Sequence, residues 1–293
     1  MTYDQLYGQI KNKGSFLCVG LDTDIEKIPA CVKEQAKAAS LPEEDAVFLF
    51  NKQIIDATAP YAIAFKVNTA FYEAMGVEGI RQMEKTATYL KAEYPDMFVI
   101  ADAKRGDIGN TAKQYAKAFF EAMDFDAVTL SPYMGGDAIT PFLKYEGKWV
   151  IILALTSNVT AEDFETLETR PHRMDVDDEA QTHVPLYERV LQKAEKWGTM
   201  DNIMFVVGAT RPDQLNRIRL LCPESFFLVP GVGVQGGKVE DVAAAGMNSS
   251  CGLIVNSSRG ILYASSGDDF ARAAAEKARE MVAEMAPFLA ENK

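Results

Sequence analysis

The sequence predicts an α/β protein built as a single (β/α)8 TIM barrel that spans residues 1–293. Short, nearly continuous apolar segments alternate with longer amphipathic segments along the chain, a pattern typical of a parallel sheet buried on both faces. Eight apolar segments occur within 293 residues. This number favours a closed barrel over the runner-up fold, a doubly wound open sheet.

The expected elements follow one another in regular order. The strands are expected at 16–21, 62–67, 97–101, 127–130, 149–155, 203–207, 226–229 and 252–255. Helical patterns lie between or after them, among others at 77–93, 110–123, 185–197, 211–220 and 268–289, where Asp268 is the expected N-cap of the last helix. Two long connections, 23–44 and 158–184, interrupt this order, and we expect a lid or rim role for the second rather than a decorative insertion.

Composition excludes several classes of protein. A net charge of −12 argues against nucleic acid as a partner. No run of 18 or more apolar residues predicts a membrane span, and the first residues do not resemble a secretory signal. Four cysteines without a CxxC pair fit reduced thiols, so we expect a cytoplasmic protein. With only two histidines, a multi-histidine metal site is excluded.

The segment 100–108, Ile-Ala-Asp-Ala-Lys-Arg-Gly-Asp-Ile, places charges at the end of a buried strand. In an extended chain, Asp102 and Lys104 point to the same face. Buried charges are costly unless they are paired or used. A structural salt bridge at the strand end is the simpler interpretation. However, polar or glycine-rich residues follow nearly every expected strand, and in a barrel these carboxyl ends meet where active sites form.

A glycine-rich segment, 231–237, follows the seventh expected strand and contains the pattern GxGxxG. A dinucleotide site would need an acidic residue at the end of the next strand, and residues 256–260 contain none. In a barrel, the loops after strands seven and eight commonly bind phosphate, and Arg259 adds a planar set of donors. We therefore expect a phosphate site, although glycines that only permit tight turns remain the alternative.

Together these motifs resemble the orotidine 5′-phosphate decarboxylases, in the longer form of that family. The resemblance is carried, in order along the chain, by residues 65–68, 102–108, 156–157, 230–235 and 257–260. It implies that orotidine 5′-monophosphate is converted to uridine 5′-monophosphate and carbon dioxide in de novo pyrimidine biosynthesis. It also implies that the reaction needs no cofactor and no metal.

The resemblance also assigns roles. Lys104 corresponds to the acid that protonates C6 of the pyrimidine, Asp102 to the carboxylate beside the leaving group, and Lys66 to the cation that completes the charge network. Asp107 corresponds to a residue that enters the partner subunit's site together with Ile108 and Thr111, which implies a homodimer with shared active sites. The other implied substrate-binding residues are Asp22 and Asn68 near the ribose, Thr156 and Ser157 at the pyrimidine edge, and Pro230, Gln235, Gly236, Ser258 and Arg259 around the phosphate.

Two alternative functions stay open at this point. Magnesium-dependent sugar-phosphate decarboxylases and aldolases of the same barrel suprafamily share the Asp-x-Lys-x-x-Asp pattern. Those relatives place an acidic residue near the end of the second strand, where this chain has Lys66-Val67-Asn68, so the sequence disfavours them. A non-catalytic sensor of a phosphoribosyl ligand is the other alternative.

Overall fold

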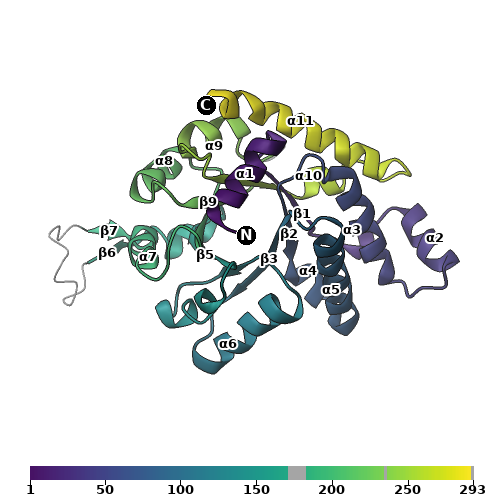
Figure 1. Ribbon diagram of the computed structural model, residues 1–293, viewed down its shortest axis with the longest axis horizontal. Helices are drawn as coiled ribbons and strands as arrows, with labels where there is room; N and C mark the ends of the chain where they lie inside the picture. The colour runs from purple at the N-terminus through teal and green to yellow at the C-terminus, as the bar shows by residue number, and fades with distance from the viewer. Residues whose placement is uncertain (171–182, 234–235, 292–293) are drawn as a thin grey trace.

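The computed structural model describes residues 1–170, 183–233 and 236–291. Eight parallel strands close into a barrel in the order β1-β10-β9-β8-β5-β4-β3-β2, and helices surround it (Figure 1). The predicted barrel is therefore confirmed, and the doubly wound open sheet was the wrong alternative.

The strands agree closely with the apolar segments of the sequence. Their bounds are β1 Leu17–Gly20, β2 Ala64–Asn68, β3 Phe98–Arg105, β4 Ala127–Leu130, β5 Trp149–Leu155, β8 Ile203–Val207, β9 Phe226–Pro230 and β10 Leu253–Ser257, with a separate pair, β6 Glu168–Thr169 and β7 Val184–Pro185. Most barrel residues are fully buried, because the barrel interior covers one face of each strand and the surrounding helices cover the other.

Helices connect the strands and cover the outside of the barrel. The α-helices are α1 Tyr3–Lys13, α2 Ala30–Ala38, α3 Asp45–Thr58, α4 Thr69–Glu73, α5 Gly76–Glu93, α6 Gly109–Lys117, α7 Leu186–Ala194, α8 Pro212–Leu221, α9 Val239–Gly246, α10 Arg259–Leu262 and α11 Phe270–Glu291. Short 3-10 helices lie at Ile25–Lys27, Gly136–Ala138, Phe142–Lys144 and Val159–Asp163, and a π-helix lies at Ala118–Ala122. None of the described helices is long and apolar enough to cross a membrane.

The N-terminal segment covers the end of the barrel where the strands begin. Figure 1 shows α1 crossing the middle of the ring of strands. The indole of Trp149, the first residue of β5, donates a hydrogen bond to the Met1 carbonyl at 2.7 Å. The Met1 amino group in turn donates to the Gly147 carbonyl at 2.8 Å. This end is thus closed, and the carboxyl ends of the strands are left for a binding site.

Two long connections and the start of the last helix can be compared with the expectations. The connection 23–44 contains a 3-10 helix and α2. The last helix begins at Phe270, so Asp269 and not Asp268 precedes it; the Asp269 carbonyl accepts the first intrahelical bond, from the Ala273 N–H. In the connection 158–184, β6 pairs with β7, whereas residues 171–182 lie outside the described part of the chain.

Candidate active site

Four charged side chains from three neighbouring strand ends form one network. Lys66 of β2 lies 2.9 Å from Asp102 of β3 and 3.5 Å from Asp22, which follows β1. Lys104 lies 2.5 Å from the other Asp102 oxygen. Asp102 therefore accepts a different ammonium group on each of its carboxylate oxygens, and the charges alternate in sign along the network.

Burial divides the network into an inner and an outer part. The side chains of Lys66 and Asp102 are only 5% and 10% exposed, whereas that of Lys104 is 51% exposed. Burial alone would raise the pKa of Asp102, but the neighbouring Lys66 and Lys104 outweigh it and lower this pKa to about 2. Burial would likewise lower the pKa of Lys66, but Asp22 and Asp102 raise it above its usual range. Both groups are consequently charged at neutral pH.

Three members of the network, Asp22, Lys66 and Asp102, line a cavity of about 510 Å³ at the carboxyl ends of the strands, whereas Lys104 is not among its lining residues. Asp22, Lys66, Asn68 and Asp102 lie on one side of this cavity. The rest of the lining comes from the ends of β9 and β10 and the loops after them: Pro230, Gly231, Val232, Gly233, Gly236, Asn256, Ser257, Ser258, Arg259 and Gly260. The cavity thus has a charged end and an end rich in glycine, serine and arginine.

Close packing explains two of the glycines around the cavity. A Cβ atom on Gly236 would lie 1.7 Å from the Gly231 carbonyl oxygen, and Gly231 itself has a φ of +86°. A Cβ on Gly20 would lie 1.9 Å from the Ser258 hydroxyl. Backbone N–H groups and a guanidinium are both good partners for phosphate oxygens. The Gly231–Arg259 side of the cavity is therefore suited to an anionic group.

The structure brings together many, but not all, of the predicted site residues. Asp22, Lys66, Asn68, Asp102, Pro230, Gly236, Ser258 and Arg259 line the cavity, and Lys104 is hydrogen-bonded to Asp102. Thr156 and Ser157 are not among the lining residues. Thr156 instead donates its hydroxyl proton towards Asn158 and Glu165, at 2.5 and 2.8 Å. Gln235 lies outside the described residues.

Asp107, Ile108 and Thr111 are not among the residues that line this cavity. The Asp107 carboxylate accepts a hydrogen bond from the Ile108 N–H at 2.8 Å, and the Ile108 side chain is exposed. Asp107 and Ile108 lie between β3 and α6, and Thr111 lies in the first turn of α6.

Asn256 and Ser257 line the cavity but were not predicted as site residues. The Asn256 amide nitrogen donates to the Ser258 hydroxyl at 3.1 Å, while its buried amide oxygen has no partner among the described residues. The signal was present in the sequence, because Asn256 is a polar residue at the end of the apolar run 253–255.

Arg105, next to Lys104, is held from several directions. Its guanidinium pairs with Glu73, donates to the Ala103 carbonyl at 2.7 Å and lies 5.3 Å from the centre of the Tyr115 ring. The Arg105 carbonyl accepts from the Ser131 N–H at 2.7 Å. These contacts fix the backbone on the carboxyl side of Lys104.

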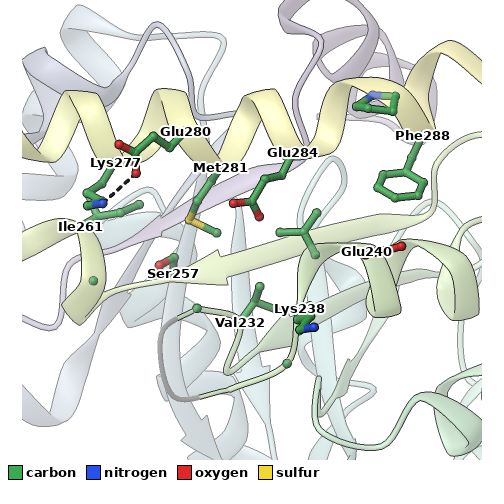
Figure 2. A pocket seen from close by; sticks show the side chains of 15 residues that line it. Val232, Lys238, Glu240, Ser257, Ile261, Lys277, Glu280, Met281, Glu284 and Phe288 are labelled. Carbon is green, nitrogen blue, oxygen red and sulfur yellow. Dashed lines mark hydrogen bonds and ion pairs between the residues drawn. The ribbon is translucent and has the colours of Figure 1, made fainter.

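A second cavity, of about 640 Å³, lies between α11, α9 and the loop after β9 (Figure 2). Apolar residues such as Met281 and Phe288 line it together with the carboxylates of Glu240, Glu280 and Glu284. Its Lys277 is paired with Glu280 at 2.7 Å. Because carboxylates predominate among its charged groups, this cavity is less suited to an anionic substrate than the cavity at the strand ends.

Within residues 1–170, 183–233 and 236–291, no group of three or more His, Cys, Asp or Glu side chains is placed to hold a metal ion. In the network at the strand ends, each carboxylate is paired with a lysine. The donor set of the described cavity thus suits an anionic organic ligand better than a cation.

Comparison with known proteins agrees with this site. Residues 15–276 match the model of the orotidine 5′-phosphate decarboxylase / HUMPS family. The chain is 54% identical to orotidine 5′-phosphate decarboxylase of Phocaeicola vulgatus, over 97% of this chain and 98% of the relative. For the enzyme of Bacteroides fragilis the identity is 52%, over 99% and 98% of the two chains.

A solved structure shares the fold as well. OMP decarboxylase of Leishmania donovani superimposes with a TM-score of 0.74 and 33% identity, over 96% of this chain and 99% of that chain. The family match covers the barrel strands and the four charged residues of the network. This chain therefore belongs to the orotidine 5′-phosphate decarboxylase / HUMPS family.

Proposed function

We propose that this protein decarboxylates orotidine 5′-monophosphate to uridine 5′-monophosphate and carbon dioxide in de novo pyrimidine biosynthesis, in the cytoplasm and without metal or cofactor. The observation that carries the proposal is the Asp22–Lys66–Asp102–Lys104 network in a cavity whose other end suits a phosphate. Relatives named as this enzyme, at more than 50% identity, support the same activity.

Lys104 is the proton donor in this proposal. Loss of carbon dioxide leaves a lone pair on C6 of the pyrimidine, which the ring stabilises poorly. An ammonium group held in place before the reaction stabilises such a charge without reorganisation. Lys104 is anchored by Asp102 but half exposed, so its ammonium can point towards the substrate and then deliver the proton. Asp102 holds it in place and lies beside the departing carboxylate.

Binding of the phosphate supplies energy far from the reacting carbon. Arg259, Ser258 and the glycine loop, with Gln235, bind the phosphate, and Asp22 and Asn68 contact the ribose. Ser157 lies beside the phosphate loop, because a Cβ on Gly231 would be 3.7 Å from its hydroxyl, and reads the pyrimidine edge with Thr156. Such remote contacts position the substrate and favour the transition state indirectly.

We also propose a homodimer in which Asp107, Ile108 and Thr111 complete the partner's site. These residues lie away from their own cavity. Exposed apolar side chains gather in the same group of loops after β3, β4 and β5: Ile108, Tyr133, Met134, Val159, Phe164 and Leu167. Apolar side chains exposed together on one face are typical of a protein interface.

The decisive test is the absorbance change when purified, metal-stripped protein is mixed with orotidine 5′-monophosphate. We expect turnover by the wild type. Lys104→Ala is expected to abolish turnover while uridine 5′-monophosphate still binds. A protein that binds the product but leaves the substrate unchanged would be a sensor. If EDTA removed activity and magnesium restored it, the metal-dependent relatives would be the better model.

Shared sites are tested by mixing two inactive variants, Lys104→Ala and Asp107→Ala. In a mixed dimer, one site has both substitutions and the other has neither, so we expect activity to reappear. Each variant alone, incubated under the same exchange conditions, serves as the control. Absence of recovery in freshly exchanged dimers would contradict the shared-site model.

A further inference from the structure

The pairing of β3 with β4 is irregular at the active site. Ala101 is opposite Val128 and Arg105 is opposite Leu130, so three residues of β3 share a single opposite residue, Thr129. Such bulges re-aim side chains and are frequent next to active sites. The three residues are 102–104, which include both charged groups that β3 contributes to the network.

The bulge requires an unfavourable backbone conformation. Lys104 has a φ of +49°, in the left-handed region that residues with a Cβ rarely adopt. A residue stays in such a conformation only where its surroundings hold it there. Arg105 is held on one side by its guanidinium and carbonyl contacts. The other side needs a partner for the Lys104 N–H, which the irregular ladder leaves without its regular bond.

Thr129 supplies this partner with a single hydroxyl. Its Oγ1 accepts a hydrogen bond from the Lys104 N–H at 2.9 Å and donates its proton to Asp102 Oδ1 at 3.0 Å. Thr129 is fully buried, so water cannot replace these bonds. A hydroxyl both accepts and donates, whereas valine, which has the same shape, does neither.

We propose that Thr129 is a positioning residue that closes the bulge and thereby sets both the backbone of Lys104 and the orientation of the Asp102 carboxylate. Asp102 Oδ1 receives Thr129 and the Lys104 ammonium, while Oδ2 receives Lys66. Without the hydroxyl, the carboxylate can rotate and the Lys104 backbone can relax, which moves the ammonium away from C6. This inference rests on the proposed decarboxylase function.

The test compares four variants with the wild type. Thr129→Val replaces the hydroxyl with a methyl group, and Thr129→Ser keeps the hydroxyl. Thr129→Ala against Thr129→Ser gives a second measurement of the hydroxyl if the valine variant does not fold. Thr58→Val is the matched control, because Thr58 is also fully buried and its hydroxyl donates only to the Ile54 carbonyl at 2.7 Å, within α3.

We expect Thr129→Val to lower kcat by about 10- to 100-fold, since a displacement of about 1 Å can cost about 100-fold. The KM and the binding of uridine 5′-monophosphate should change less than about threefold, because the phosphate and ribose contacts are untouched. Thr129→Ser should keep kcat within about threefold, Thr129→Ala should resemble valine, and Thr58→Val should leave kcat unchanged.

Equal kcat values for the serine, alanine and valine variants would overturn the proposal, as would a loss of product binding equal to the loss of kcat. A wild-type protein that does not turn over orotidine 5′-monophosphate would instead refute the proposed function. The two failures are therefore distinguishable.

Discussion

Asp102 is expected to contribute to stability as well as to catalysis, and Asp102→Asn tests this. Its pKa lies at about 2 in the folded protein, against about 3.9 for a free aspartate. One pH unit of difference is worth about 1.4 kcal/mol, so the ionised carboxylate stabilises the fold by about 2 kcal/mol. Removing one member of a buried pair can cost about 3–5 kcal/mol. We expect Asp102→Asn to lose about 2–4 kcal/mol at pH 7, measured by urea unfolding.

The sign of the pH dependence follows from the lowered pKa. The stabilisation is complete above the unfolded pKa, near 4, and is lost as the pH falls through the folded value, near 2. The difference in unfolding free energy between the wild type and Asp102→Asn should therefore fall to about half of its pH 7 value near pH 3. Asp24→Asn is the control, because Asp24 pairs with the exposed Lys27 at 2.8 Å and should cost less than about 1 kcal/mol. Equal losses for the two variants, or a difference independent of pH, would refute the reasoning.

Three further predictions concern Arg105 beside the network, Arg219 near the starts of two strands, and Lys66 within the network. Arg105→Lys keeps the charge but loses the planar guanidinium, which binds several partners at once. In steady-state assays kcat should therefore fall by about tenfold while KM stays unchanged. The buried Arg219 guanidinium donates to five backbone carbonyls near the starts of β9 and β10. Arg219→Lys should therefore lower the unfolding free energy by about 2–4 kcal/mol and leave kcat unchanged. Lys66→Met should lower the free energy of unfolding, measured with urea, by about 3 kcal/mol, because Asp102 then lacks the buried ammonium that neutralises it.

The barrel could be predicted because its signal is local and repeated. Residues 127–130, 149–155 and 203–207 are strands with the bounds that the apolar runs indicate. The expected end of the third strand at 101 was wrong, since β3 continues to Arg105. A prediction from hydrophobicity ends the strand where charged residues begin. In this structure the charged residues belong to the strand, because they are paired with one another.

The site could be predicted as a set of strand ends but not as a set of contacts. Barrel topology places Asp22, Lys66, Asp102 and Arg259 around one cavity without any knowledge of their side-chain conformations. The β3 bulge opposite Thr129 could not be predicted, because it depends on a register shift between two strands. The Thr156 hydroxyl is directed towards Glu165, which the loop after β5 brings back to the end of that strand. Contacts between distant loops leave no periodic signal in the sequence.

The two lysines of the network illustrate why geometry adds to composition. Both are paired with Asp102, yet Lys66 is buried and Lys104 is half exposed. The Lys66 ammonium lies between the Asp22 and Asp102 carboxylates, and its charge keeps Asp102 ionised. The Lys104 side chain is bound to the same carboxylate but is half exposed, so part of its ammonium group is open to a ligand. For the proposed decarboxylation, this difference in burial favours Lys104 over Lys66 as the proton donor, a distinction that their shared residue type conceals.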